Sequence, residues 1–137
     1  MPVAINIPES IIVLCGSMTF IEKMKDISAI LSKEGFAPII PDEDINECKK
    51  ELSRRHFDKI ADKNTHAILV VNESKNGKDN YIGASTFAEI ALAFYFEKEI
   101  YILNEIYQPY KDELLAWGSQ TLNGNVRILK ECVLCIR

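Results

Sequence analysis

The sequence lacks several features that mark specialised classes of protein. It has no block of lysine and arginine, and its 16 basic and 20 acidic residues give a net charge of -4, so it lacks the basic surface that binds a phosphate backbone. No apolar run approaches the roughly 20 residues that span a bilayer. The N-terminal segment has neither the charged nor the apolar region of a secretory signal. We therefore expect a cytoplasmic protein that binds neither nucleic acid polymers nor membranes.

Cysteine is also sparse. Four cysteines in 137 residues do not indicate a disulfide-stapled fold, so we expect reduced thiols. Cys132-x-x-Cys135 has the spacing of half a zinc site or of a redox pair, but zinc needs two further ligands and the chain has only two histidines. A lone CxxC is weak evidence, so we predict no metal and no cofactor. The alternation from Val133 to Ile136 instead predicts a terminal strand.

What the sequence does contain is enough apolar material for one domain. Hydrophobic residues make up 47% of the chain, which supports a core for a single domain over residues 1–137. Short apolar runs alternate with segments of helical period, which indicates a parallel sheet with helices on both faces. The predicted strands are Ile11–Cys15, Ala37–Ile40, His66–Val71, Ile100–Leu103 and a final strand region at Val126–Ile136. The predicted helices are Thr19–Lys33, a second one carrying Leu52, Phe57, Ile60 and Ala61, Ser85–Phe96, and a short one at Tyr110–Trp117.

In such an α/β sheet, ligands bind beyond the carboxyl ends of the strands. That rule selects four segments, which are Cys15–Thr19, Pro41–Asp44, Asn72–Glu89 and the chain from Asn104 onward. Long polar loops such as Asn72–Tyr81 often carry function.

The helix Ser85–Phe96 is apolar on every side except at its start and at Glu89. A buried carboxylate survives only if it is paired, hydrogen-bonded or functional. One reading is structural, because Thr86-x-x-Glu89 has the spacing of a capping box. In the other reading Glu89 is a nucleophile, kept ionised by the positive end of its helix. The two roles are compatible.

The Gly16-Ser17 turn places backbone amides and a hydroxyl at a helix N-terminus, which suits phosphate or sugar oxygens, although ordinary strand-to-helix turns use the same residues. Asp58 can reach the same crevice or can simply pair with Arg54 at i, i+4. The loop before the Glu89 helix offers further polar groups that can also be plain loop and cap residues. They are the hydroxyls of Tyr81 and Ser85, the close backbone approach at Gly83, and the amides of Asn72 and Asn80.

These segments together match one family. They are Ile-Val-Leu-Cys-Gly-Ser-Met, which begins at Ile12, His-Phe-Asp-Lys-Ile, Ala-Ile-Leu-Val-Val-Asn, and Tyr-Ile-Gly-Ala-Ser-Thr-Phe-Ala-Glu-Ile-Ala-Leu-Ala-Phe. In this order, over residues 11 to about 104, the chain resembles the nucleoside 2-deoxyribosyltransferase superfamily, which includes the 2'-deoxynucleoside 5'-phosphate N-hydrolases. The helical glutamate followed by small residues is the most specific part.

The resemblance implies a role for each matched residue. Glu89 matches the nucleophile that attacks the anomeric carbon, and Asp58 matches the aspartate that assists near the base and the sugar. Cys15, Gly16 and Ser17, followed by Met18, match the loop that holds the sugar or 5'-phosphate. The implied fold is flavodoxin-like and three-layered, with about five parallel strands, in a homodimer or larger assembly.

Three positions depart from the family pattern. Val13 stands where many members have a tyrosine, which leaves Tyr81 to support the nucleophile, and His66 stands where an aspartate is common. Gly83 replaces a serine of the phosphate-specific hydrolases, so Ser85 is a displaced candidate. The leading hypothesis is cleavage or transfer at the N-glycosidic bond of a nucleoside or nucleotide. Its alternatives are a nucleotide-binding or sensing domain without turnover and a homo-oligomeric interaction module.

Overall fold

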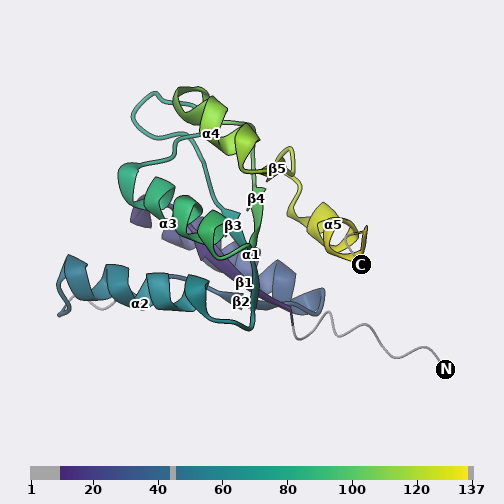
Figure 1. Cartoon of the computed structure of the whole chain (residues 1–137), viewed down its shortest axis with the longest axis horizontal. Coiled ribbons are helices and arrows are strands. Elements are labelled where there is room, and N and C mark those ends of the chain that lie inside the picture. Colours follow the sequence, from purple (N-terminus) through teal and green to yellow (C-terminus); the bar gives the residue numbers. More distant parts are fainter. Residues whose placement is uncertain (1–9, 44–45, 136–137) are drawn as a thin grey trace.

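Five parallel strands form the central sheet of the protein (Figure 1). The computed structural model describes residues 10–43 and 46–135. The strands are β1 (Ile11–Cys15), β2 (Ala37–Ile39), β3 (Thr65–Val70), β4 (Glu99–Ile102) and β5 (Gln120–Thr121), in the order β2-β1-β3-β4-β5. This is the strand order of flavodoxin-like folds, and it confirms the predicted three-layer α/β architecture.

Helices cover both faces of the sheet because side chains alternate along each strand. In β1, Ile12 and Leu14 pack with α1 (Ile21–Lys33) and α5 (Leu129–Cys135) in one core cluster. Val13 and Cys15 face the other side, where α2 (Lys49–Ala61), α3 (Ala84–Tyr95) and α4 (Lys111–Ala116) lie. Short 3-10 turns precede three of these helices, at Met18–Phe20, Gln108–Tyr110 and Val126–Ile128.

The strand register fixes where the crevice lies. Cys15 at the end of β1 pairs with Val70 at the end of β3, so the two strands finish at the same level. The chain order reverses beside β1, since β2 lies on one side of it and β3 on the other. Because α2 and α3 lie side by side over this part of the sheet (Figure 1), any side chain that they aim at the end of β1 is brought to one place.

The prediction of a final strand at Val126–Ile136 is wrong. Residues Val126–Ile128 form a 3-10 turn and Leu129–Cys135 form helix α5, while Ile136 lies outside the described residues. The edge of the sheet is instead the two-residue strand β5. Val126, Leu129 and Val133 are all buried, and their spacing of three and four residues is helical. The alternation at the very end of the chain concealed this longer helical period.

The predicted capping box at the start of α3 is also wrong. The N-cap is Gly83, which makes no side-chain cap, and Thr86 lies inside the first turn. Glu89 therefore belongs to the second turn, where the positive helix end acts on it less than the sequence suggested. The carboxylate of Glu89 is free of any capping duty, so its burial needs another explanation.

In the described part of the chain, none of the helices combines the length and the apolar character needed to cross a membrane.

Candidate active site

A cleft of about 800 Å³ opens beyond the carboxyl ends of β1 and β2, between α2 and α3. This is the place where open α/β sheets bind ligands. The described residues that line it are Gly16, Ser17, Met18, Ile21, Pro41, Asp42, Glu43, Glu47, Lys49, Leu52, Ser53, His56, Lys75, Tyr81, Gly83, Ala84, Ser85, Thr86 and Glu89. The cleft has room for a ligand of the size of a nucleotide, because small-molecule sites commonly measure about 300–1,000 Å³.

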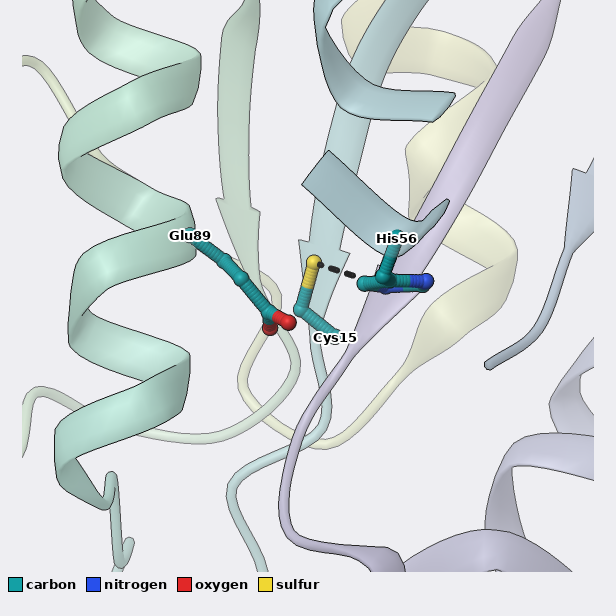
Figure 2. Close-up of side chains that lie close together, drawn as sticks. All are labelled: Cys15, His56 and Glu89. Atoms are coloured by element: carbon teal, nitrogen blue, oxygen red, sulfur yellow. Dashed lines mark hydrogen bonds between the residues drawn. The ribbon is translucent and has the colours of Figure 1, made fainter. Parts of the chain in front are cut away.

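Glu89 lies at the bottom of this cleft. Only 9% of its surface is exposed, and its side chain comes from the second turn of α3 (Figure 2). Burial raises the pKa of Glu89 from 4.5 to about 7, and the neighbouring Cys15 thiol, which can donate a hydrogen bond to the carboxylate, partly offsets this rise. The carboxyl group of Glu89 therefore changes its protonation state close to neutral pH.

Cys15 lies directly beneath the cleft, as the last residue of β1. It is a free thiol with no exposed surface, and its sulfur lies 3.7 Å from the Nε2 atom of His56 (Figure 2). Burial, together with the charge of Glu89, raises the pKa of Cys15 well above its usual value. Cys15 is thus a neutral hydrogen-bonding group here and not a thiolate nucleophile.

His56 is a site residue that the sequence analysis missed. It is 4% exposed, comes from α2, and its Nε2 atom lies 2.9 Å from the carbonyl oxygen of Leu14, to which it donates. Its Nδ1 atom is buried and has no hydrogen-bond partner in the described part of the chain. Burial lowers the pKa of His56 to about 4, so the imidazole is neutral at pH 7. The sequence does contain a pattern that predicts this position. His56 is four residues from both Leu52 and Ile60, which were expected to face the sheet, so it lies on the same side of the helix.

The loop after β1 forms one wall of the cleft. Ser17 accepts a hydrogen bond from the backbone of Thr19 at 3.3 Å and from the Nζ atom of Lys75 at 2.9 Å. A Cβ atom on Gly16 would lie 2.8 Å from the carbonyl oxygen of Val71, so only glycine permits this close approach. Lys75, a second residue that the sequence analysis did not select, brings a positive charge from the long loop to the Ser17 hydroxyl.

The opposite wall is the segment that leads into α3. Tyr81 and Ser85, which were predicted as site residues, line the cleft, and so does Thr86. A Cβ atom on Gly83 would lie 2.9 Å from the hydroxyl of Tyr81, so the glycine leaves room for this hydroxyl at the start of the helix. The ring of Tyr81 is held edge-on against Tyr107, with 5.8 Å between ring centres.

Four predicted site residues do not line the cleft: Cys15, which lies beneath it, and Asp58, Asn72 and Asn80. Asp58 is exposed on α2, and in the described part of the chain no ion pair joins it to Arg54 either. Asn72 is fully buried, and its amide group bonds to the backbone of Asn104 and Glu105, which holds the loops together. Asn80 lines a separate, smaller hollow of about 380 Å³.

The arrangement can therefore hold a small polar molecule against a desolvated carboxyl group. Cationic Lys75 and Lys49 lie in the same cleft as acidic residues near α2. Of these, Asp42 is neutralised by Lys59 at 3.0 Å, which lowers the pKa of Asp42. Glu89 is the most buried of the carboxylates that line the cleft.

No family model matches the chain, and no curated protein is significantly similar to it. The geometry of the cleft and the chemistry of its residues therefore carry the functional argument.

Proposed function

We propose that the protein cleaves or transfers at the N-glycosidic bond of a nucleoside or nucleoside 5'-monophosphate, with Glu89 as the nucleophile. The observation that carries this proposal is a desolvated carboxyl group at the bottom of a nucleotide-sized cleft, held by a helix that has no other charge. A carboxylate in a water-poor site is well suited to attack a sugar carbon that develops oxocarbenium character.

In the proposed reaction the ionised carboxylate of Glu89 attacks the anomeric carbon. The carbon–nitrogen bond breaks, the leaving base takes up a proton from water, and a glycosyl ester of Glu89 forms. Water then releases the free sugar, or the nitrogen of a second base accepts the glycosyl group, and the carboxylate is restored. No metal or redox cofactor takes part. Asp58 lies outside the cleft lining, so we assign no proton transfer to it.

Two other cleft residues have supporting roles in this proposal. Tyr81 places a hydroxyl at the start of α3 and takes the role of the tyrosine that is replaced by Val13. Ser17 and Lys75 lie next to each other at the rim, where they can bind the oxygens of the sugar or of a 5'-phosphate.

The competing proposals are a nucleotide-binding or sensing domain and an interaction module. The second is favoured by one observation, the exposed aromatic end of α3, where Phe94 is 46%, Tyr95 is 77% and Phe96 is 43% exposed. Exposed apolar clusters of this kind mark contact surfaces. We include this feature in the main proposal as the contact of a homodimer or larger assembly, and we propose that the protein works in the cytoplasm.

The test is release of free base from deoxynucleosides and from their 5'-monophosphates, with and without a second base. Glu89→Gln keeps the size of the side chain and removes the nucleophile, so we expect it to lose roughly 1,000-fold or more of the activity. Glu113→Gln, an exposed position on α4, is the matched control and should keep full activity. Binding of a nucleotide without base release would favour the sensing domain, and full activity in Glu89→Gln would overturn the mechanism.

A further inference from the structure

We propose that Cys15, His56 and Glu89 form a Zn²⁺ site at the bottom of the cleft. They offer one sulfur, one imidazole nitrogen and one carboxylate oxygen, and these donor atoms all lie within 4.8 Å of one another (Figure 2). The sequence alone predicts no metal, because the CxxC at the end of the chain is weak evidence by itself. The fold instead brings together three residues that are far apart in the sequence.

The spacing of the donors suits zinc. Bond lengths of about 2.3 Å to sulfur and 2.0–2.1 Å to nitrogen place two tetrahedral ligands about 3.6 Å apart. The Cys15 sulfur and the His56 Nε2 atom are 3.7 Å apart. Each ligand comes from a different regular element, β1, α2 or α3, so the trio is held by the core and not by a flexible loop.

The chemistry of the donors selects the metal. Sulfur and imidazole together favour zinc over magnesium and calcium, which prefer oxygen ligands. Glu89 forms no ion pair with any lysine or arginine of the described residues, so its buried charge has no cationic partner. A divalent cation would supply one, as the Cys15 thiol gives up its proton and binds as thiolate.

The imidazole of His56 gives up one hydrogen bond in this exchange, the one that Nε2 donates to the Leu14 carbonyl. Its Nε2 proton is held by the Leu14 carbonyl, and its buried Nδ1 atom has no partner in the described part of the chain. When Nε2 binds the cation, the proton moves to Nδ1 and the ring stays neutral. The free Nδ1 atom, which has no role in the proposed reaction, is what makes this change of tautomer available.

Such a site would regulate the reaction. Three protein ligands leave a fourth position open, and it faces the cleft because His56 and Glu89 both line it. Zinc bound there occupies the Glu89 oxygen that would attack the sugar, so zinc and substrate exclude each other. This inhibition rests on the proposed function, whereas zinc binding itself does not.

Binding is tested on the metal-free wild-type protein with Co²⁺, a spectroscopic substitute for Zn²⁺, followed by displacement with Zn²⁺. We expect a thiolate-to-cobalt charge-transfer band that zinc abolishes at one ion per chain. Cys15→Ser should lose the band, and His56→Gln should weaken zinc binding by about 100-fold or more, since even loss of outer-shell partners costs about 10–100-fold. Cys48→Ser, at an exposed free cysteine, and Cys132→Ser, in the CxxC, should keep both signals.

Absence of the charge-transfer band in the wild-type protein would overturn the zinc site, and so would its loss only in Cys132→Ser. A second assay measures base release at increasing zinc concentration. Inhibition that follows zinc occupancy, and is relieved by a chelator, supports the regulatory role. A protein that binds zinc but releases no base at any zinc concentration would keep the site and refute the proposed reaction, so the two claims fail separately.

Discussion

At the scale of single residues, the environment of Glu89 decides what the protein can do. The carboxyl group is desolvated by the core around it, and its pKa of about 7 makes the fraction of the ionised form, the proposed nucleophile, sensitive to small changes near neutrality. Cys15 is the neighbour that counteracts this desolvation. The ionised fraction of Glu89 is therefore set mainly by its burial and is adjusted by one buried thiol.

Replacing Cys15 should move the pH dependence of the reaction. In the wild type, kcat/KM should rise with pH and reach half its plateau near pH 7, because only ionised Glu89 attacks. Cys15→Ala removes the hydrogen-bond donor, so the pKa of Glu89 rises and the midpoint moves to higher pH. Cys15→Ser keeps a donor and should stay close to the wild type, as should Cys48→Ala. The measurement is kcat/KM from pH 5 to 9 with a chelator present, and an unmoved midpoint in Cys15→Ala would refute the role of the thiol.

We expect Lys75 to determine the preference for 5'-monophosphates over nucleosides. Its Nζ atom lies 2.9 Å from the Ser17 hydroxyl and makes no ion pair in the described part of the chain, so its charge is available to a phosphate. Lys75→Gln should raise the KM for 5'-monophosphates by roughly tenfold and leave that for nucleosides nearly unchanged. Lys78→Gln, an exposed lysine of the same loop, is the matched control. Equal effects of Lys75→Gln on both substrate classes would show that Lys75 does not read the phosphate.

Some of the site residues could be predicted from the sequence and others could not. Glu89 was detectable because a charge on an apolar helix is anomalous wherever the helix lies. His56 was not selected because a histidine on the inner face of a helix resembles any other core position until its neighbours in space are known. Asp58 failed for a related reason: a shift of two residues along α2, from position 56 to 58, turns a side chain from the core to solvent.

At the scale of the elements, helix α3 has two distinct ends. Its beginning presents Thr86 and Glu89 to the cleft, whereas its end presents aromatic side chains to solvent. Phe94 stacks on Trp117 with 5.2 Å between ring centres, which joins α3 to the end of α4. The same helix therefore carries both the proposed nucleophile and the proposed contact surface.

A charge at this surface should weaken self-association. Tyr95 is 77% exposed, so Tyr95→Glu should leave the fold intact and place a charge in the middle of the proposed dimer contact. We expect sedimentation equilibrium to show a dimer for the wild type and mainly monomer for Tyr95→Glu. Glu113→Lys, on the exposed side of α4, should leave the dimer unchanged. A wild type that is monomeric at all concentrations would remove the homodimer from the proposal.

Helices and strands were predictable where the apolar residues followed a single period along the sequence. The strand runs of β1, β3 and β4 and the long helices appear close to their predicted positions, because buried parallel strands are short continuous apolar runs. The last segment was misassigned because alternation over a few residues competed with a helical period, and only the shared burial of Val126, Leu129 and Val133 decides between them.

At the scale of the whole molecule, Glu89 and His56 give opposite contributions to stability as the pH changes. The pKa of Glu89 rises on folding from 4.5 to about 7, so it lowers stability as the pH rises through this range. The pKa of His56 falls on folding from 6.5 to about 4, so stability is lost as the pH falls through that range. Each shift changes the free energy of unfolding by about 3 kcal/mol over its pH range. Between pH 4.5 and 6.5 the two changes have opposite signs and largely cancel.

Glu89→Gln should change the pH dependence of the free energy of unfolding. The variant lacks the penalty of the buried charge, so its free energy of unfolding relative to the wild type should increase by about 3 kcal/mol between pH 4.5 and pH 8. Urea unfolding at several pH values, with a chelator present, measures this difference. Glu113→Gln should follow the wild-type curve throughout. Parallel curves for Glu89→Gln and the wild type would show that Glu89 is not desolvated in the folded protein.

The architecture itself was the most predictable level. The alternation of apolar strands and helices specifies a parallel sheet covered on both faces, and the carboxyl-end rule located the cleft. What the sequence could not supply was the meeting of Cys15, His56 and Glu89, since it depends on how α2 and α3 pack over the end of β1.

The most direct test of the central claim is the mass of the protein stopped with acid during turnover of a deoxynucleoside. Nucleophilic attack predicts a fraction of chains heavier by one deoxyribosyl group, with the added mass on the peptide that contains Glu89 and absent from Glu89→Gln. A slow 2'-fluorinated substrate can be used to accumulate the ester. Rapid base release with no adduct at any time, or an adduct on another residue, would contradict the role of Glu89 as the nucleophile.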